Sequence, residues 1–181
     1  MKVYVFLAEG FETVEAFGPI DVLRRAGVET HTVSLTDSLL VESAQGVTTM
    51  ADCALDEIDL SDGAAVILPG GFPGFKNLAE NEKVGEIVRS YYDSGRLVCA
   101  ICGAPTVLKV NGVAEGRRLT CHYSVIDQMS GYQVVRDDVV KDHNLITSSG
   151  AGHSVEFGLA ILGELLKGDK VDDVKRGMEL K

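Results

Sequence analysis

The amino-acid sequence predicts an α/β fold in which a mostly parallel sheet is covered by helices on both faces. Short apolar runs alternate with stretches of helical periodicity along the whole chain, a pattern typical of such sheets. Two of these runs, residues 64–68 and 97–101, are apolar at every position. Strands that are buried on both faces have this composition, so these two are expected at the centre of the sheet.

Each expected element follows from a run of residues and from the residues that end it. In the first half of the chain, these are a strand at residues 2–7, a helix that stops at Ala26-Gly27, a strand at 28–35, a β-hairpin at 41–50, a strand at 64–68 and a helix at 81–94. In the second half, they are a strand at 97–101, a helical run at 106–110, a strand-like stretch at 119–121, a second hairpin at 132–141, a strand at 144–148 and a helix from about 154 to 167.

Composition limits the classes of function. The 181 residues favour one domain, 1–181, and the net charge of −10 argues against nucleic acid or an anionic membrane as partner. No apolar run reaches the roughly 18 residues of a membrane span, and the first residues read as a strand rather than a signal peptide. The four cysteines fit no disulfide scaffold, so a cytoplasmic location is expected.

Cys102 is the first candidate functional residue. It follows a buried strand, and small residues come directly after it, as in a nucleophile elbow on a strained turn. The amino end of the following helix would lower the pKa of a thiol placed there. The alternative is an inert, packed thiol, which is the expected state of Cys99 in the middle of the strand.

The Gly-rich loop at residues 68–74 is the second candidate. It also follows a buried strand, so its backbone N–H groups can face an anion in the same crevice as Cys102. It lacks the Gly-Lys-Ser/Thr of a phosphate-binding loop, and an ordinary turn is the alternative.

Glu15 is the third candidate. It begins a helical stripe of apolar or small residues that continues with Pro19, Val22, Leu23 and Ala26. If the carboxyl faces inward, desolvation raises its pKa, and the protonated group can donate a hydrogen bond to a thiolate. If it faces water, it is a first-turn glutamate like Glu12. Pro19 predicts an irregular backbone near Glu15.

His122 follows the strand-like stretch at residues 119–121 and could act there as an acid or base. The other histidines, His31, His143 and His153, are expected on the surface or in structural hydrogen bonds. No pair of His, Cys or carboxylate residues has zinc-like spacing, so neither a metal nor a cofactor is expected.

Five segments in this order resemble the DJ/ThiJ/PfpI superfamily, and most of all its Parkinsonism-associated protein deglycase branch: LAEGFETVE, DVLRRAG, VILPGG, AICGAPTVL and TSSGAGHSVEFGLAI. The resemblance covers nearly the whole chain. It implies a flavodoxin-like three-layer sandwich, usually a homodimer. It further implies that Cys102 is the reactive, oxidation-prone cysteine, Glu15 its acidic partner, and His122 a histidine near the pocket. Gly71 and Gly103 match residues whose backbone amides border the thiol.

Two departures from the family pattern bear on activity. Gly103 stands where the PfpI-type peptidases have a histidine, which weighs against peptidase activity, and it replaces an alanine of the deglycase branch, which is expected to loosen the turn. Ser149 stands where the deglycase branch has an arginine, so an anion-binding group is missing at that position.

Four functions follow as hypotheses. The first is an enzyme that acts on small aldehydes, reactive dicarbonyls or glycated adducts through a Cys102 nucleophile. The second is a redox sensor or stress-response chaperone that is switched by the sulfinic acid of Cys102. A cysteine peptidase or amidohydrolase that uses His122 is the third, and a flavin or nucleotide carrier, suggested by fold alone, is the fourth.

Overall fold

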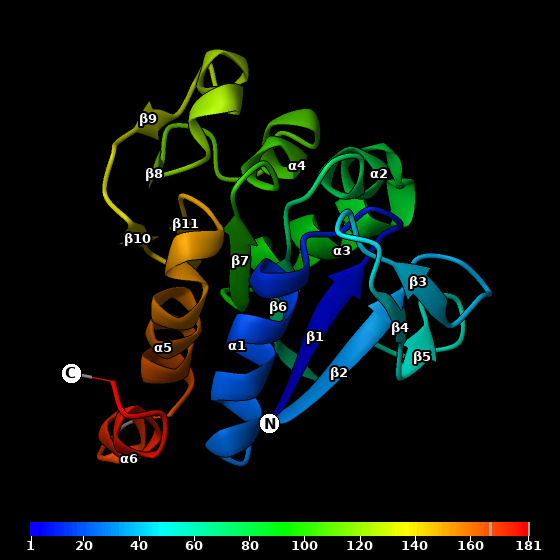
Figure 1. Ribbon diagram of the computed structural model, residues 1–181. Helices are drawn as coiled ribbons and strands as arrows, with labels where there is room; N and C mark the ends of the chain where they lie inside the picture. Colours follow the sequence, from blue (N-terminus) through cyan, green and yellow to red (C-terminus); the bar gives the residue numbers. More distant parts are fainter. Residues whose placement is uncertain (167, 181) are drawn as a thin grey trace.

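The computed structural model describes residues 1–166 and 168–180 and confirms the predicted fold class (Figure 1). A seven-stranded sheet has the order β10-β11-β7-β6-β1-β2-β5, and only β10 runs antiparallel to its neighbour. Its strands are β1 (Lys2–Leu7), β2 (Glu29–Ser34), β5 (Cys53–Ala54), β6 (Gly63–Leu68), β7 (Leu97–Ile101), β10 (Val139–Asp142) and β11 (Leu145–Ser148).

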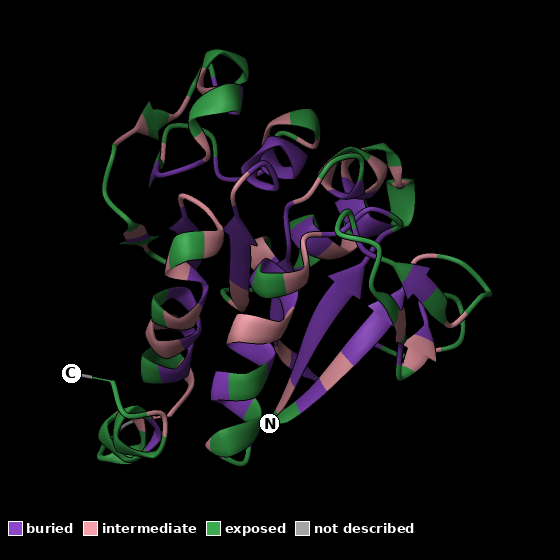
Figure 2. Cartoon of the chain, viewed as in Figure 1, coloured by how far each residue is buried: buried purple, intermediate pink, exposed green. Residues whose placement is uncertain are grey.

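Helices cover both faces of this sheet, and each face has its own hydrophobic core. On one face pack α1 (Thr13–Arg25), α5 (Ser154–Leu165) and α6 (Lys170–Gly177), and on the other α2 (Gly74–Glu80), α3 (Glu82–Asp93) and α4 (Pro105–Val110). Alternate side chains of β1 enter opposite cores: Val5 lies in the first and Phe6 in the second. The central strands are therefore buried along nearly their whole length (Figure 2), which explains why they are apolar at successive positions.

Most predicted elements are confirmed to within a residue or two. Asn81 and Ser94 cap α3 as expected, and α1 ends at Arg25 before Gly27, whose φ of +79° requires a left-handed backbone. The predicted end of the last helix at residue 167 lies outside the described residues; α5 itself ends at Leu165. The irregular backbone predicted at Pro19 is wrong, because α1 continues through it.

The second predicted hairpin is wrong, whereas the first is confirmed as β3 (Leu40–Glu42) paired antiparallel with β4 (Thr48–Met50). In the second region, β9 (Gln133–Val134) pairs parallel with β8 (Arg118–Leu119), and β10 pairs with β11. The connection between β9 and β10, residues 135–138, includes two aspartates, which suit a turn, but the strands β8 and β11 are the partners that β9 and β10 find. Each strand therefore pairs elsewhere.

The connectivity creates a crevice at one edge of the sheet. From β1 the chain passes to β2 on one side, and it later returns to β6 on the other side of β1. Ligand sites of open α/β sheets lie at such a switch point, outside the carboxyl ends of the strands. The segments after β1, β6 and β7 meet at this edge. Within the described part of the chain, no helix has both the length and the apolar character needed to cross a membrane.

Candidate active site

Cys102 lies on a sharp turn, as predicted. It follows the last residue of β7 and has a φ of +64°, a left-handed conformation that is strained for a residue with a side chain. Two hydrogen bonds hold this conformation: the Cys102 N–H donates to the Ser148 carbonyl at 2.9 Å, and the His122 N–H donates to the Cys102 carbonyl at 2.8 Å. The turn is therefore held by the strand beside it and by the segment that carries His122.

Gly103 fits tightly after this turn. A Cβ at Gly103 would lie 2.6 Å from Cδ1 of Phe75, so no larger residue fits without movement of that ring. Phe75 of α2 fills the space that a side chain would take, so the site is built for glycine, and whether glycine also loosens the turn stays a prediction. Neither α2 nor this contact was visible in the sequence pattern.

Glu15 points inward and is 1% exposed, with the stripe Pro19, Val22 and Leu23 buried behind it. Glu12 is the N-cap of α1, and its Oε2 accepts the Glu15 N–H at 2.7 Å. The Glu15 carboxylate accepts the Gly70 N–H at 2.9 Å through its Oε2. Of the two orientations considered for Glu15, the structure has the inward one, and Glu12 has a structural role of its own.

Gly70 joins the two reactive groups. A Cβ at Gly70 would lie 2.5 Å from Glu15 Oε2 and 2.7 Å from Cys102 Cβ, so both side chains pack directly against its backbone. Only glycine allows this approach. Gly71, with a φ of +89°, continues the loop, and a Cβ there would lie 2.3 Å from the Glu12 nitrogen. The N–H groups of Gly71 and Gly103 both donate toward the Cys102 sulfur.

Burial raises the pKa of Glu15 from its ordinary 4.5 to about 7, and the charge of Glu12 adds to this increase. Hydrogen bonds from Cys102 and from the N–H groups of Gly70 and Ala151 act in the opposite direction. A carboxyl with a pKa near neutrality can both accept and return a proton at physiological pH. The raised pKa agrees with the expectation for an inward-facing Glu15.

Burial is the main cause that raises the pKa of the Cys102 thiol to about 12. The charge of Glu15 and the hydrogen bond to Glu15 raise this pKa further, whereas the backbone amides of Gly103 and Gly71 lower it. The expectation of a lowered thiol pKa is therefore wrong. The helix α4 has only six residues and begins at Pro105, so its dipole is too weak to outweigh burial. Because thiol and carboxyl interact directly, they titrate as a pair that loses its first proton near pH 7.

His122 lies next to this pair, connected to Cys102 through its backbone. Its ring nitrogen Nδ1 hydrogen-bonds the Ser124 hydroxyl at 2.8 Å, which fixes the orientation of the imidazole. The strand β8 ends at Leu119, two residues earlier than the predicted strand-like stretch. His122 therefore sits in the connection after β8 and forms part of a cavity wall.

That cavity, which we call the His122 cavity, has a volume of about 370 Å³. It is lined by Thr120, Cys121, His122, Tyr123, Arg136, Asp138, Ser149, Gly150, Ala151, Gly152 and His153. Of these, sequence reasoning pointed only to His122 as a functional residue. The others come from three segments far apart in the chain, and no local motif predicts that they meet.

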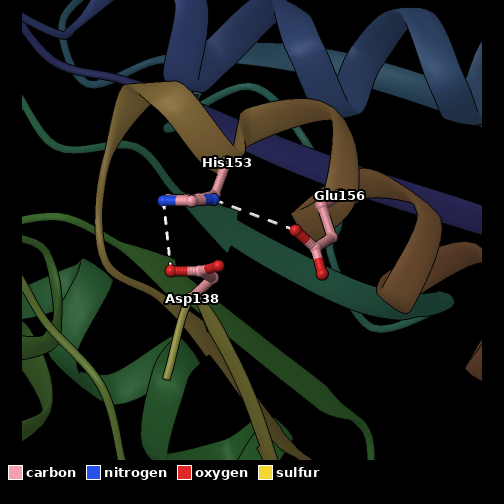
Figure 3. A group of neighbouring side chains, drawn as sticks. All are labelled: Asp138, His153 and Glu156. Carbon is pink, nitrogen blue, oxygen red and sulfur yellow. Dashed lines mark ion pairs between the residues drawn. The ribbon is translucent and has the colours of Figure 1, made fainter. Parts of the chain in front are cut away.

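His153 bridges two carboxylates at the rim of this cavity (Figure 3). Its Nε2 lies 3.3 Å from Asp138 Oδ1, and its Nδ1 lies 3.8 Å from Glu156 Oε2. Ligand atoms of the three residues lie within 4.8 Å of one another, a grouping that spacing in the sequence did not indicate. The two carboxylates contact opposite nitrogens of the ring, so a shared metal ion would require the imidazole to turn. As the arrangement stands, the imidazole lies between the two carboxylates, with one carboxylate facing each ring nitrogen.

Comparison with known proteins identifies relatives that match nearly the whole chain. Protein dj-1beta of Drosophila melanogaster is 40% identical over 176 residues, which cover 96% of this chain and 94% of the relative. The glutathione-independent glyoxalase DJR-1.2 of Caenorhabditis elegans is 39% identical over 163 residues, covering 88% and 85%. The Parkinson disease protein 7 homolog of Danio rerio is 35% identical over 184 residues, covering 99% and 97%.

Solved structures agree with this relationship. The crystal structure of Drosophila melanogaster DJ-1beta superposes with a TM-score of 0.96 at 39% identity, over 99% of this chain and 98% of the other. Toxoplasma gondii DJ-1 in an oxidised form superposes with a TM-score of 0.94 at 26% identity, over 99% and 98%. The DJ-1/PfpI family pattern matches residues 1–164. The chain described above, with its parallel sheet and its Cys102 turn, belongs to the DJ-1/PfpI family.

Proposed function

We propose that this protein is a thiol-dependent enzyme of carbonyl stress that converts reactive dicarbonyls, or the adducts they form on other molecules, to 2-hydroxy acids. The observation that carries the proposal is the contact of one thiol, Cys102, with one buried carboxyl, Glu15, whose pKa of about 7 suits proton transfer at neutral pH. The name of the similar Caenorhabditis elegans protein, a glutathione-independent glyoxalase, supports the same substrate class.

The first step is addition of Cys102 to the aldehyde carbon of methylglyoxal. The sulfur forms a bond to carbon while its proton passes to the Glu15 carboxylate, and the carbonyl electron pair moves to oxygen. The N–H groups of Gly71 and Gly103 can donate to the developing oxyanion. Glu15 then returns the proton to that oxygen, which gives a hemithioacetal. The raised pKa of the Cys102 thiol does not prevent this step, because Glu15 removes the proton as attack occurs.

The second step moves hydrogen between the two carbons of the substrate. A base, Glu15 or His122, takes the proton from the carbon attached to sulfur, and a proton is delivered to the neighbouring carbon through an enediol. The first carbon is thereby oxidised to a thioester and the second is reduced to an alcohol, so no external oxidant is needed. Water hydrolyses the thioester, which releases lactate and restores the Cys102 thiol.

Lactate formation from methylglyoxal by the purified protein tests the proposal. Cys102→Ala should lose at least 100-fold in kcat/KM, and Cys53→Ala, which removes a thiol of β5 away from the His122 cavity, should retain most of the activity. Glu15→Gln keeps the acceptor for the Gly70 N–H but cannot take a proton, and it should lose activity mainly in kcat. Equal rates for wild type and Cys102→Ala would disprove a thiol mechanism.

A redox sensor is the second candidate. The same contact of Cys102 with Glu15 would hold a sulfinic acid by a hydrogen bond from the carboxyl, and a relative of known structure, Toxoplasma gondii DJ-1, exists in an oxidised form. Mild peroxide and intact-mass measurement test this candidate. It requires addition of two oxygens at Cys102, lost in Glu15→Leu, and oxidation spread over all four cysteines would contradict it. The peptidase hypothesis is weaker, since Gly103 stands where the PfpI-type peptidases have the histidine that pairs with the cysteine.

We also infer that the chain forms one domain, 1–181, and a homodimer. The start of α1 and the β3–β4 hairpin carry four exposed apolar side chains: Val14, Leu40, Val47 and Met50. The hairpin is attached to α1 by the hydrogen bond of Thr13 to Ser43 at 2.8 Å. An exposed apolar group of this kind is typical of an interaction surface, and a second copy would cover it.

A further inference from the structure

We propose that Arg136 binds an anionic group of the substrate in the His122 cavity, so that the enzyme prefers 2-oxo aldehydes that carry a carboxylate or a phosphate. This inference rests on the proposed function of Cys102 and adds the substrate class. It assigns a role in specificity to a residue that lies outside every motif recognised in the sequence.

The charge of Arg136 has no partner among the residues that the structure describes, although two aspartates follow it directly in the chain. Asp137 pairs with Arg118, and Asp138 pairs with His153 (Figure 3). Both nearby carboxylates are therefore engaged by other cations or donors. An arginine that lines a cavity without a carboxylate partner can bind an incoming carboxylate or phosphate through its planar fork of donors.

The wall of the cavity also contains a buried hydroxyl. Thr120 lines it and is 1% exposed, and its Oγ1 has no hydrogen-bond partner within the described ranges 1–166 and 168–180. A buried hydroxyl without a partner is costly, but this oxygen is enclosed within the wall and does not face a ligand in the open cavity. Gly152 leaves open space, since a Cβ built there meets no atom within 4 Å. Burial raises the pKa of the Cys121 thiol to about 11, and the charge of Arg136 acts in the opposite direction, in agreement with the place of both residues in this wall.

Two segments that line the cavity also hold the reacting pair, although neither Cys102 nor Glu15 is itself a lining residue. The His122 N–H donates to the Cys102 carbonyl at 2.8 Å, and the Ala151 N–H donates to the Glu15 carboxyl. A substrate that fills the cavity thus lies against both segments that position the thiol and its proton acceptor. The net charge of −10 repels anions in general, so selective binding of an anion depends on a local cation such as Arg136.

Two alkylating reagents of nearly equal size test this inference without any turnover. Iodoacetate carries a carboxylate and iodoacetamide is neutral, and both react with the same thiol. The ratio of their rates at Cys102, measured by peptide mass spectrometry at fixed pH and ionic strength, reports how well the cavity receives an anion. Arg136→Gln should lower this ratio about fivefold, as expected for loss of one partly solvated charge contact, with the iodoacetamide rate unchanged. Arg136→Lys should restore part of it.

Arg25→Gln is the matched control. Arg25 is also an exposed arginine, but it pairs with Asp21 at the end of α1 away from the crevice, so its loss changes the net charge equally. A ratio that is unchanged in Arg136→Gln, or lowered equally in both variants, would overturn the inference. So would a wild-type Cys102 that reacts with neither reagent. Failure of the proposed enzyme is a separate outcome, recognised by full methylglyoxal turnover in Cys102→Ala.

Discussion

Glu15→Gln should change the pH dependence of folding stability, because the carboxyl is 1% exposed and its pKa rises from 4.5 to about 7 on folding. The folded state then holds this proton more tightly than the unfolded state does. The contribution of protonated Glu15 to the free energy of unfolding is fully present below about pH 4.5 and is lost as the pH rises through 7. At about 1.36 kcal/mol for each pKa unit, the loss amounts to about 3 kcal/mol.

Urea unfolding followed by far-UV circular dichroism suits the measurement, since the chain has no tryptophan. The free energy of unfolding of wild type minus that of Glu15→Gln should fall by about 3 kcal/mol between pH 4.5 and pH 8.5. Glu86→Gln, which removes an exposed carboxyl of α3, should show a much smaller change because solvent screens that charge. A difference that stays constant with pH, or grows as the pH rises, would refute the assignment of Glu15 as a buried acid with a raised pKa.

Two further changes test the packing around the site and the assembly of the chain. Gly103→Ala should destabilise the fold by about 1–3 kcal/mol, because the new methyl group overlaps the Phe75 ring. In the double variant, Phe75→Leu should recover part of this loss. Thermal melts in which the two single effects simply add would contradict the contact. Met50→Glu should shift the protein from dimer to monomer, since Met50 is 72% exposed in the single chain and would lie in the interface. Light scattering after size-exclusion chromatography measures the mass. An unchanged mass would show that the hairpin is not the interface.

Local signals in the sequence were sufficient for most of the fold. The strands at residues 64–68 and 97–101 are apolar on every position because both faces of the sheet are covered, and this signal depends only on neighbouring residues. The second hairpin failed because pairing of β9 and β10 depends on partners elsewhere in the chain. The helix α6 was missed because it is short and charged, and Val174 is its buried residue.

The residues of the candidate site were likewise predictable only where a local sequence signal marks them. Cys102, Glu15 and Gly71 could be proposed from a strand end, a helical stripe and consecutive glycines, and the structure brings them together. The pKa of the thiol could not be predicted, because burial and the charge of Glu15 depend on how the fold brings the start of α1 to the turn after β7. The His122 cavity was also beyond local reasoning, since Arg136 and the residues around it come from separate segments.

The central claim is that Glu15 accepts the proton of Cys102 near neutral pH, and the pH dependence of Cys102 alkylation by iodoacetamide tests it most directly. In wild type the rate should rise with an inflection near pH 7, where the pair loses its first proton, and rise again in strongly alkaline solution. In Glu15→Gln the inflection near pH 7 should disappear. The same inflection in both proteins, or a purely alkaline inflection in wild type, would contradict the account.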